Sequence, residues 1–390
     1  MKIIAKTLEG LEQILADEIR DIGGENIEIL NRAVAFTGDI TTLYKANLLL
    51  RTTIKVLVFL KEFQIRNEND LYDEVMKLPW EDYFSLDQTF AIDSVVNSSQ
   101  FNHANFISLK TKDAIVDRFR QKFGSRPSVD TTDPHLKINV HIRENTVTLS
   151  FDSSGTSLHM RGYRRAQVDA PMNEVLAAGL VLISGWKGET PLIDPMCGSG
   201  TILCEAVKIA ANMPPQSFDR NFAFKKWKTF DETMWNLVCE NAQKQINLSA
   251  LPKIQGFDIL PKAVKASQIN VETAGLEKYI EIAEEDFFYQ EGTEYATLIF
   301  NPPYDERLRE NDVTELYRQI GDKLKLCFTN CDVWIISGHL EAMKNVGLRP
   351  SVRKKMLNGS IQSLYCKYEM YKGTKKSKWI NKYGNAETNN

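Results

Sequence analysis

The sequence of 390 residues lacks the features that mark membrane, secreted and zinc-binding proteins. No apolar run approaches the roughly 18 residues that a membrane-spanning helix requires. The first residues, Met1–Ala5, lead directly into a charged helical pattern, which is not typical of a signal peptide. The 6 cysteines form no Cys-x-x-Cys pair and no cluster with histidine. We therefore expect a cytoplasmic protein with reduced cysteines, no membrane segment, no disulfide framework and no metal.

The sequence also lacks an excess of positive charge. Its 48 Lys and Arg residues against 51 Asp and Glu residues give a net charge of −3. This balance argues against nucleic-acid binding by bulk electrostatic attraction and leaves only local basic patches. A run of charges is most often an ordinary solvated surface. The patches are Arg161, Arg164 and Arg165; Lys225, Lys226 and Lys228; Arg349, Arg353, Lys354 and Lys355; and the lysines between Lys372 and Lys382.

A chain of this length is too long to fold around one hydrophobic core, so we expect two or three domains. Residues 1–64 read as a small α+β unit in which Leu8–Ile22 is a predicted helix. Residues 65–160 form a second unit, whose longest predicted helix covers Asn105–Phe123. A predicted strand over Leu158–Arg165 leads into the remainder of the chain. None of these segments carries residues that suggest catalysis.

A glycine-rich loop joins a predicted strand to a predicted helix in the second half of the chain. It reads Asp194-Pro195-Met196-Cys197-Gly198-Ser199-Gly200-Thr201. Ile202 stands where a dinucleotide site has its third glycine, and no Gly-Lys-Ser/Thr follows, so neither nucleotide fingerprint is present. Such a turn is often only structural. However, Asp194 ends the strand, where a carboxylate faces the ligand crevice of an open α/β sheet.

A second loop, Asn301-Pro302-Pro303-Tyr304, follows the predicted strand Thr297–Phe300 directly. Two prolines fix φ and remove two N–H donors, so the loop is rigid. It offers an amide oxygen, a backbone carbonyl and an aromatic ring, which together suit a planar group that carries an NH₂. A plain proline turn explains the loop equally well on its own, but its combination with the Asp194 loop favours a binding site.

Together the two loops resemble motifs I and IV of the amino-methylating S-adenosylmethionine-dependent methyltransferases. Along most of residues 1–370 the chain resembles the first methyltransferase half of the bacterial 23S rRNA guanine-N2 methyltransferases that carry an N-terminal THUMP domain. Five further stretches carry this resemblance in the family's order: Gly10–Glu12, Lys112–Asp117, Arg126–Asp130, Leu158–Arg164 and Asn301–Leu308.

The resemblance implies an α/β fold, in which a seven-stranded, Rossmann-like class I methyltransferase core follows α+β ferredoxin-like and THUMP domains. The implied ranges are 1–64 for the ferredoxin-like domain, 65–160 for the RNA-binding THUMP domain and 165–372 for the methyltransferase domain. Residues 373–390 form a polar basic tail. The implied cofactor is S-adenosylmethionine. The implied partner is 23S rRNA or a large-subunit precursor, with no obligate protein partner.

Cofactor contacts are expected at the carboxyl ends of several strands. Asp258, followed by Ile259, ends a strand where a carboxylate suits ribose hydroxyls. In the family, an acid at Asp286 accepts from the adenine amino group and Phe287 packs on the ring, although Glu284 and Glu285 leave the register open. Glu174 is a weaker candidate. The remaining cofactor candidates are Asp194, Pro195, Met196, Cys197, Gly198, Gly200, Thr201 and Asn301, and the catalytic candidates are Asn301, Pro302, Pro303 and Tyr304.

RNA contacts are expected from Arg161, Arg164, Arg165, Lys225 and Lys226. The last two belong to an insertion, residues 212–250, in which aromatic and basic side chains alternate. Such a pattern suits a single-strand platform but is more often part of a core. The aromatic residues of the insertion are Phe222, Phe224, Trp227, Phe230 and Trp235.

The predicted function is methylation of the exocyclic N2 of a guanine in 23S rRNA. Adenine-N6 methylation of RNA or DNA is an alternative because Asn-Pro-Pro-Tyr loops serve those enzymes too. A non-catalytic RNA-binding ribosome-assembly factor is another, although it would have no reason to keep all the site residues. Two departures from the family stand out: Asp305 replaces a small residue, and the second methyltransferase domain of the large enzymes is not part of this sequence.

Overall fold

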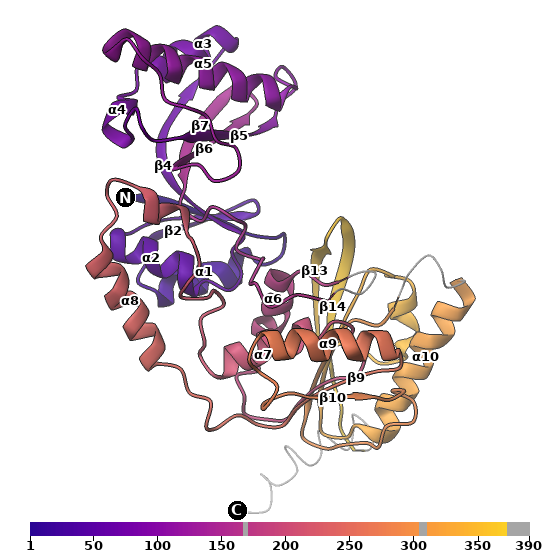
Figure 1. Cartoon of the computed structure of the whole chain (residues 1–390). Helices are drawn as coiled ribbons and strands as arrows, with labels where there is room; N and C mark the ends of the chain where they lie inside the picture. Colours follow the sequence, from indigo (N-terminus) through magenta and orange to yellow (C-terminus); the bar gives the residue numbers. More distant parts are fainter. Residues whose placement is uncertain (167–170, 304–309, 373–390) are drawn as a thin grey trace, which may run out of the picture. The chain divides into compact units, whose positions relative to one another are not determined.

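The computed structural model describes residues 1–166, 171–303 and 310–372, which form two compact units (Figure 1). The first unit contains residues 1–7, 15–160 and 216–242. The second contains residues 8–14, 161–215 and the chain from residue 243 onward. Tyr304, Asp305 and the predicted tail 373–390 lie outside the described residues. No helix in the described part of the chain is long and apolar enough to cross a membrane.

The first unit is built on one 7-stranded sheet in the order β2-β3-β1-β4-β7-β6-β5. The strand β4 pairs with β1 on one side and β7 on the other, so the predicted ranges 1–64 and 65–160 share this sheet. Only β5 and β6 pair in parallel. The strands are β1 (Lys2–Lys6), β2 (Glu25–Leu30), β3 (Ala33–Thr37), β4 (Lys55–Gln64), β5 (Phe90–Asn97), β6 (Leu136–Arg143) and β7 (Thr146–Asp152).

The helices of the first unit begin and end at recognisable signals. Asp39 caps α2 by accepting from the Thr42 N–H at 2.8 Å, and Gly124 ends α5 in the left-handed conformation. These helices are α1 (Glu12–Asp21), α2 (Ile40–Leu49), α3 (Glu68–Met76), α4 (Trp80–Tyr83) and α5 (Ala104–Phe123), and residues 216–242 add the 3₁₀ turn η1 (Ala223–Lys226) and most of α8 (Glu232–Lys244).

Aromatic residues of the predicted insertion are part of a hydrophobic core in the first unit. Phe222, Phe224 and Trp235 are buried and pack with Tyr44, whose ring stacks on Phe224 at 4.7 Å. The core interpretation of this segment is therefore the one that the structure supports, because buried rings offer no face to a nucleobase.

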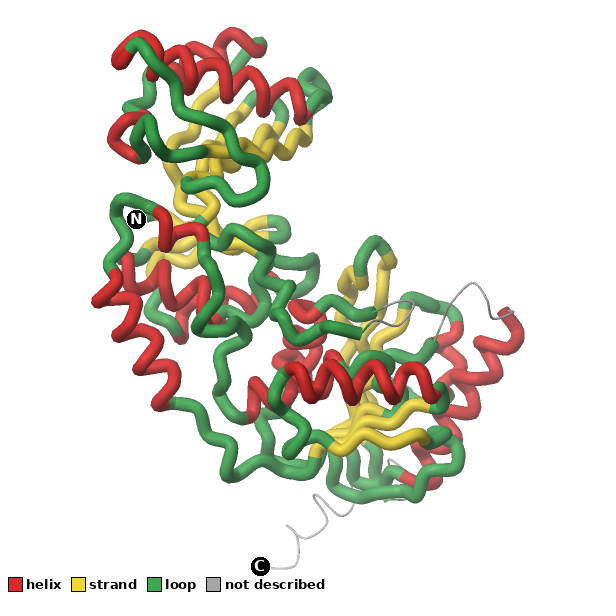
Figure 2. Tube along the Cα trace, in the orientation of Figure 1, coloured by secondary structure: helices red, strands yellow, loops and turns green. Residues whose placement is uncertain are grey.

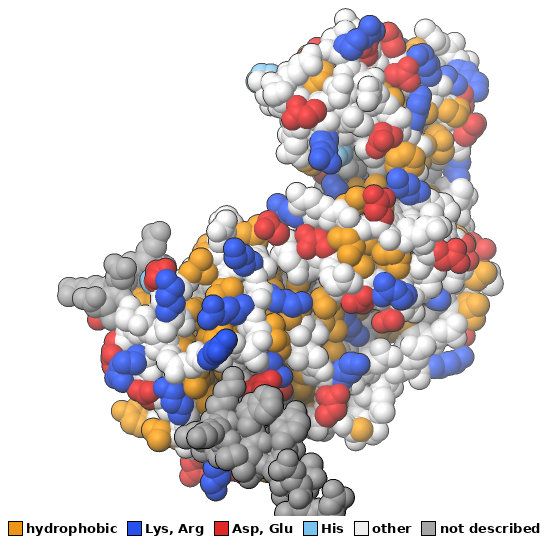
Figure 3. Space-filling model, turned by 180° about the vertical axis from the view of Figure 1, so that it is seen from behind, with side chains coloured by type: hydrophobic (Ala, Val, Ile, Leu, Met, Phe, Trp, Pro, Cys, Tyr) orange, Lys and Arg blue, Asp and Glu red, His pale blue; other side chains and the backbone are white. Residues whose placement is uncertain are grey.

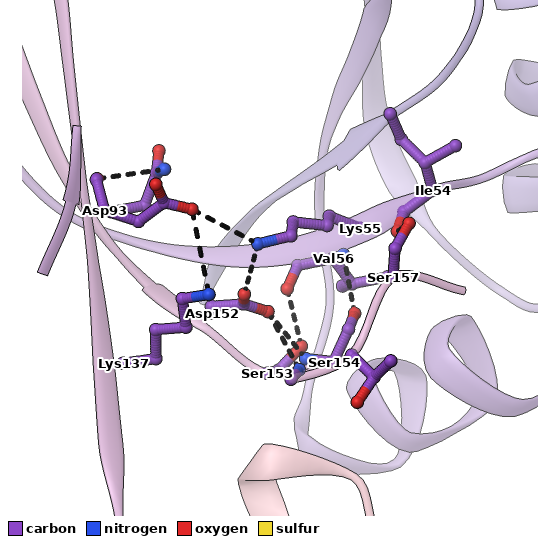
Figure 4. A network of polar contacts seen from close by, with 12 residues as sticks. Ile54, Lys55, Val56, Asp93, Lys137, Asp152, Ser153, Ser154 and Ser157 are labelled. Carbon is purple, nitrogen blue, oxygen red and sulfur yellow. Dashed lines mark hydrogen bonds and ion pairs between the residues drawn. The ribbon is translucent and has the colours of Figure 1, made fainter. Parts of the chain in front are cut away.

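A polar network fixes the turn after β7 to the neighbouring strands (Figure 4). Lys55 Nζ lies 2.7 Å from Asp152 Oδ2 and 3.6 Å from Asp93 Oδ2. Burial opposes the charge on Lys55, but the two carboxylates outweigh it and raise the pKa of its ammonium group. The other oxygen of Asp152 accepts from the N–H groups of Ser154 and Gly155 at 3.0 and 3.1 Å.

The second unit is built on another 7-stranded sheet, in the order β10-β9-β8-β11-β12-β14-β13. All pairs are parallel except those of β14, which runs antiparallel between β12 and β13. The predicted seven-stranded core is thus confirmed, and its last two strands form an antiparallel hairpin. The strands are β8 (Leu192–Asp194), β9 (Ile254–Asp258), β10 (Glu281–Glu284), β11 (Thr297–Phe300), β12 (Asp332–Ser337), β13 (Val352–Asn358) and β14 (Ile361–Glu369).

Helices cover both faces of this sheet (Figure 2). One hydrophobic cluster joins α6, α7 and α9 to the sheet, and another joins α10 and η2 to it. Continuous burial on both faces accounts for the apolar runs that the sequence showed in these strands. The helices are α6 (Glu174–Ser184), α7 (Thr201–Ala210), α9 (Pro261–Thr273), α10 (Glu310–Cys327) and the 3₁₀ helix η2 (Ala342–Val346).

Two sequence-based predictions of secondary structure were wrong. Leu158–Arg165 forms no strand, because its side chains and backbone make individual contacts instead of a ladder. The helix predicted over Leu8–Ile22 begins only at Glu12. Residues 8–14 belong to the second unit, where Leu11 is fully buried against Gly179 of α6.

Candidate active site

A cavity of about 830 Å³ opens at the carboxyl ends of β8, β9 and β11. The strand order reverses between β8 and β11, and such a switch point is where open α/β sheets bind ligands. The cavity is lined by Pro171, Met172, Asn173, Asp194, Pro195, Met196, Cys197, Gly198, Ser199, Thr201, Ile202, Asp258, Ile259, Leu260, Lys262, Ala263, Asp286, Phe287, Phe288, Asn301, Pro302, Pro303, Leu316, Asn358, Gly359 and Ile361.

The glycine loop forms the floor of this cavity. Gly198 and Gly200 have φ of 55° and 74°, and Gly200 is the residue from which α7 begins. A Cβ on Gly200 would lie 3.1 Å from Cβ of Ser267, so glycine is needed both for the conformation and for the approach of α9. Gly200 itself does not line the cavity, whereas Gly198 does.

Three carboxylates enter the cavity from three adjacent strands. Asp258 accepts from the Gly198 N–H at 2.9 Å and from the Leu260 N–H at 3.0 Å. Asp286 accepts from the Phe288 N–H at 2.9 Å. Its neighbours Glu284 and Glu285 do not line the cavity.

Asp194 is the most deeply buried of the three, with 1% of its surface exposed. Burial raises the pKa of its carboxyl well above the ordinary value, and the charge of Asp258 acts in the same direction. The Met196 N–H, at 3.2 Å from Oδ1, opposes the shift. A buried carboxyl whose pKa is shifted and that lines a cavity is a candidate for a functional group.

The loop after β11 presents an unsatisfied acceptor. Asn301 lines the cavity, and its Oδ1 atom is buried without a hydrogen-bond partner. Pro302 is buried beside it and Pro303 is exposed. A buried acceptor without a partner costs about 1–3 kcal/mol, so this atom is suited to accept a hydrogen bond from a bound molecule.

The arginines that were expected to bind RNA turn inward in the second unit. Arg164 Nη2 donates to the Met172 carbonyl and, at 3.2 Å, to Oγ1 of Thr201, both on the cavity wall. It also lies 3.4 Å from Glu174, which does not line the cavity. Arg161 is buried, and its Nε lies 3.6 Å from the carboxylate of Glu205. These arginines therefore support the wall of the cavity.

The other three RNA candidates are placed differently. Lys225 and Lys226 belong to the first unit, where Lys225 Nζ lies 4.8 Å above the Trp235 ring and Lys226 pairs with Asp133. Arg165 is exposed. The structure therefore does not gather the five candidates into one basic patch.

Several lining residues escaped the sequence-based prediction. Met172 and Asn173 approach from the start of α6, and Asn358, Gly359 and Ile361 from the hairpin of β13 and β14. In the sequence, the dipeptide Asn358-Gly359 predicts only a hairpin turn, because nothing in the local sequence says which other loops it meets.

The strand order and the cavity at its switch point define the fold of class I S-adenosylmethionine-dependent methyltransferases. Residues 161–367 match the RMKL-like methyltransferase domain, residues 66–152 the THUMP domain and residues 2–57 the RlmL ferredoxin-like domain. The chain belongs to the RMKL-like methyltransferase family, and the resemblance seen in the sequence is confirmed.

The chain is 37% identical to a putative RNA methyltransferase of Synechocystis sp., over 94% of this chain and 96% of that protein. It is 35% identical to the ribosomal RNA large subunit methyltransferase K/L of Syntrophotalea carbinolica, over 93% of this chain and 52% of that protein. The chain thus spans about half the length of the K/L relatives that it matches. The crystal structure of a putative methyltransferase complexed with SAH is similar with a TM-score of 0.86 and 28% identity, over 96% of this chain and 99% of that one.

S-adenosylmethionine is accordingly the cofactor of this methyltransferase. The cavity volume of about 830 Å³ lies within the range of roughly 300–1,000 Å³ that is usual for such ligands. Asp258 keeps lone pairs on both oxygens beside the two N–H bonds that it accepts, so hydroxyl groups can still bind to it. The donors and acceptors of this cavity therefore fit a nucleoside that carries a cationic centre.

Proposed function

We propose that this protein transfers a methyl group to the exocyclic N2 of a guanine in 23S rRNA. The observation that carries the proposal is Asn301, a residue that lines the cavity and whose Oδ1 is a buried acceptor without a hydrogen-bond partner. An amino group on a planar base satisfies this acceptor with one of its protons. The THUMP match and the names of the K/L relatives, which are ribosomal RNA large subunit methyltransferases, support ribosomal RNA as the substrate.

S-adenosylmethionine, when bound, supplies an electrophilic methyl group. The contribution of the chain is to hold the nucleophile in line with that group, and such positioning supplies much of the rate of a displacement reaction. Asn301 Oδ1 and the Pro302 carbonyl accept from the amino group and direct its lone pair. The two prolines keep these acceptors in place because their φ angles are fixed.

The target guanine must leave its stack to enter such a cavity, at a cost of a few kcal/mol. Stacking on Tyr304, which lies outside the described residues, would return roughly 1–3 kcal/mol of that cost. Mapping the product decides between the candidate reactions. Unmodified 23S rRNA is incubated with the protein and labelled cofactor, digested, and its nucleosides are identified by mass spectrometry.

N2-methylguanosine is the expected product. Detection of N6-methyladenosine would show that the substrate base is adenine and not guanine. RNA that carries no label would reject RNA methylation. Asn301→Ala is expected to abolish turnover while the affinity for S-adenosylhomocysteine stays nearly unchanged. Asn345→Ala is the matched control, because this asparagine of η2 is exposed and does not line the cavity.

A further inference from the structure

The hairpin of β13 and β14, called the hairpin arm here (residues 352–369), reaches the edge of the sheet where the cavity opens (Figure 1). The strand β14 is antiparallel to β12 and to β13, so β13 runs in the same direction as the parallel strands. Its end therefore lies at the same edge as the carboxyl ends of β8, β9 and β11. Asn358, Gly359 and Ile361 of the arm line the cavity together with Asn301.

The strand register shows how far the arm extends. Ser337, the last residue of β12, pairs with Leu364, and Leu364 pairs with Lys355. Lys355 is thus level with the end of the sheet, and the residues from Met356 to Ser363 extend past it. At about 3.4 Å per residue, the three steps from Lys355 to Asn358 cover about 10 Å, which places this lysine within one nucleotide or two of the cavity.

Two cations of the arm share one face. Arg353 and Lys355 are exposed and two residues apart, so both side chains project from the same side of β13. The strand β13 ends the order of the sheet and pairs only with β14. Within residues 1–166, 171–303 and 310–372, neither cation has an ion-pair partner.

Several other basic residues of the second unit are paired, and Lys265 and Lys278, which are unpaired among the described residues, lie on and just after α9 and do not line the cavity. Ion pairs join Arg164 to Glu174, Arg318 to Glu315 and Lys344 to Glu341. Lys and Arg side chains with hydrophobic side chains between them are visible on the second unit at the lower left of Figure 3. Ile361, which is 46% exposed, provides an apolar side chain at the cavity end of the arm.

We propose that the hairpin arm holds the RNA strand on which the target base lies. Arg353 and Lys355 bind consecutive phosphates of the backbone, and Ile361 packs against the base or sugar at the cavity mouth. Phosphate contacts of this kind set register and orientation without reading sequence. This inference rests on the proposed function, since it takes RNA as the substrate.

The test compares the full-length parent with the double variant Arg353→Gln/Lys355→Gln in binding to 23S rRNA at several salt concentrations. Each lost phosphate contact reduces the slope of log K against log salt by about 0.7–0.9, so we expect a slope that is shallower by about 1.4–1.8. The KM for RNA should rise, whereas the dissociation constant of S-adenosylhomocysteine stays unchanged, which also shows that the variant is folded.

The matched control is Lys265→Gln/Lys278→Gln. These two lysines are also exposed and without an ion-pair partner among the described residues, but they lie on and just after α9, beside the opposite edge strand β10. The control should keep the parental slope. An unchanged slope in the arm variant, or an equal loss in the control, would overturn the inference.

Failure of the proposed function gives a different result from failure of the arm. A parent that methylates rRNA while the arm variant binds and turns over RNA like the parent would reject only the arm. A parent that neither binds nor methylates 23S rRNA would reject the proposed function and the arm together. Ile361→Ser distinguishes the apolar contact at the cavity from the phosphate contacts. It should lower turnover on RNA without changing the slope of log K against log salt.

Discussion

Leu11 and Gly179 offer a test of how the second unit is assembled. Leu11 is fully buried, and a Cβ on Gly179 would lie 2.5 Å from its Cδ2 and 2.8 Å from its Cδ1. Leu11→Ala should lower the free energy of unfolding by about 2–5 kcal/mol, which is the usual cost of such a cavity in a core. Because α6 also supplies Asn173 to the cavity wall, this contact connects the N-terminal segment to the site.

The effect of Gly179→Ala on the free energy of unfolding is expected to change sign between the parent protein and the Leu11→Ala variant. In the parent, overpacking against Leu11 costs about 1–3 kcal/mol. The better helix propensity of alanine offsets about 1 kcal/mol of it. In the Leu11→Ala background the methyl group enters vacated space, so the same substitution should stabilise by about 1–2 kcal/mol. The net cost of about 0–2 kcal/mol in the parent and the gain of about 1–2 kcal/mol in the Leu11→Ala background give a coupling energy of about 1–4 kcal/mol, which reaches the upper end for residues in contact.

Calorimetry with and without S-adenosylhomocysteine is the assay, since the ligand shifts the transition of the unit that binds it. Leu15→Ala is the control: Leu15 is equally buried but belongs to the first unit, so its effect should add to that of Gly179→Ala without coupling. If Gly179→Ala destabilised both backgrounds equally, Leu11 would not occupy the space beside α6. The same contact predicts that a fragment starting near residue 165 is less stable than the second unit with residues 8–14.

Three further predictions concern carboxylates. Asp258→Ala should weaken cofactor binding by about 1–3 kcal/mol in calorimetric titration, whereas Glu284→Ala, paired with it on β10 but outside the cavity, should not. The raised pKa of Asp194 makes its ionisation costly as pH rises above about 4, the ordinary range of a carboxyl. Asp194→Asn should therefore raise the melting temperature at neutral pH, and this gain should disappear as the pH falls below about 4. The same variant should weaken cofactor binding. A lower melting temperature at pH 7 would refute the raised pKa of Asp194. Asp152→Ala should lower the free energy of unfolding by about 1–3 kcal/mol, because it removes the buried carboxylate that accepts from the Ser154 and Gly155 N–H groups and pairs with Lys55. Thermal unfolding that matches the parent would contradict this.

The sequence alone determined the fold class of the second unit and the positions of its loops. Strands that are buried on both faces read as short apolar runs, and each run ends in a polar residue where the chain leaves the sheet. This local rule placed Asp194, Asp258 and Asn301 at strand ends, and parallel strands bring their ends to one edge. The hairpin signal of Asn358-Gly359 was equally local, and the structure has the two-residue turn one position later, at Gly359 and Ser360.

Only the tertiary structure decided which side chains face a partner and which face the protein. Arg161 and Arg164 look like solvated cations in the sequence, but Arg161 is buried beside Glu205 and Arg164 pairs with Glu174. Leu11 was expected within a helix over Leu8–Ile22, yet it precedes that helix and packs on Gly179, 168 positions later. Charge pairing and close packing depend on contacts between distant segments, which no local pattern encodes. Arg353 and Lys355 became distinctive only because the structure places their hairpin at the cavity.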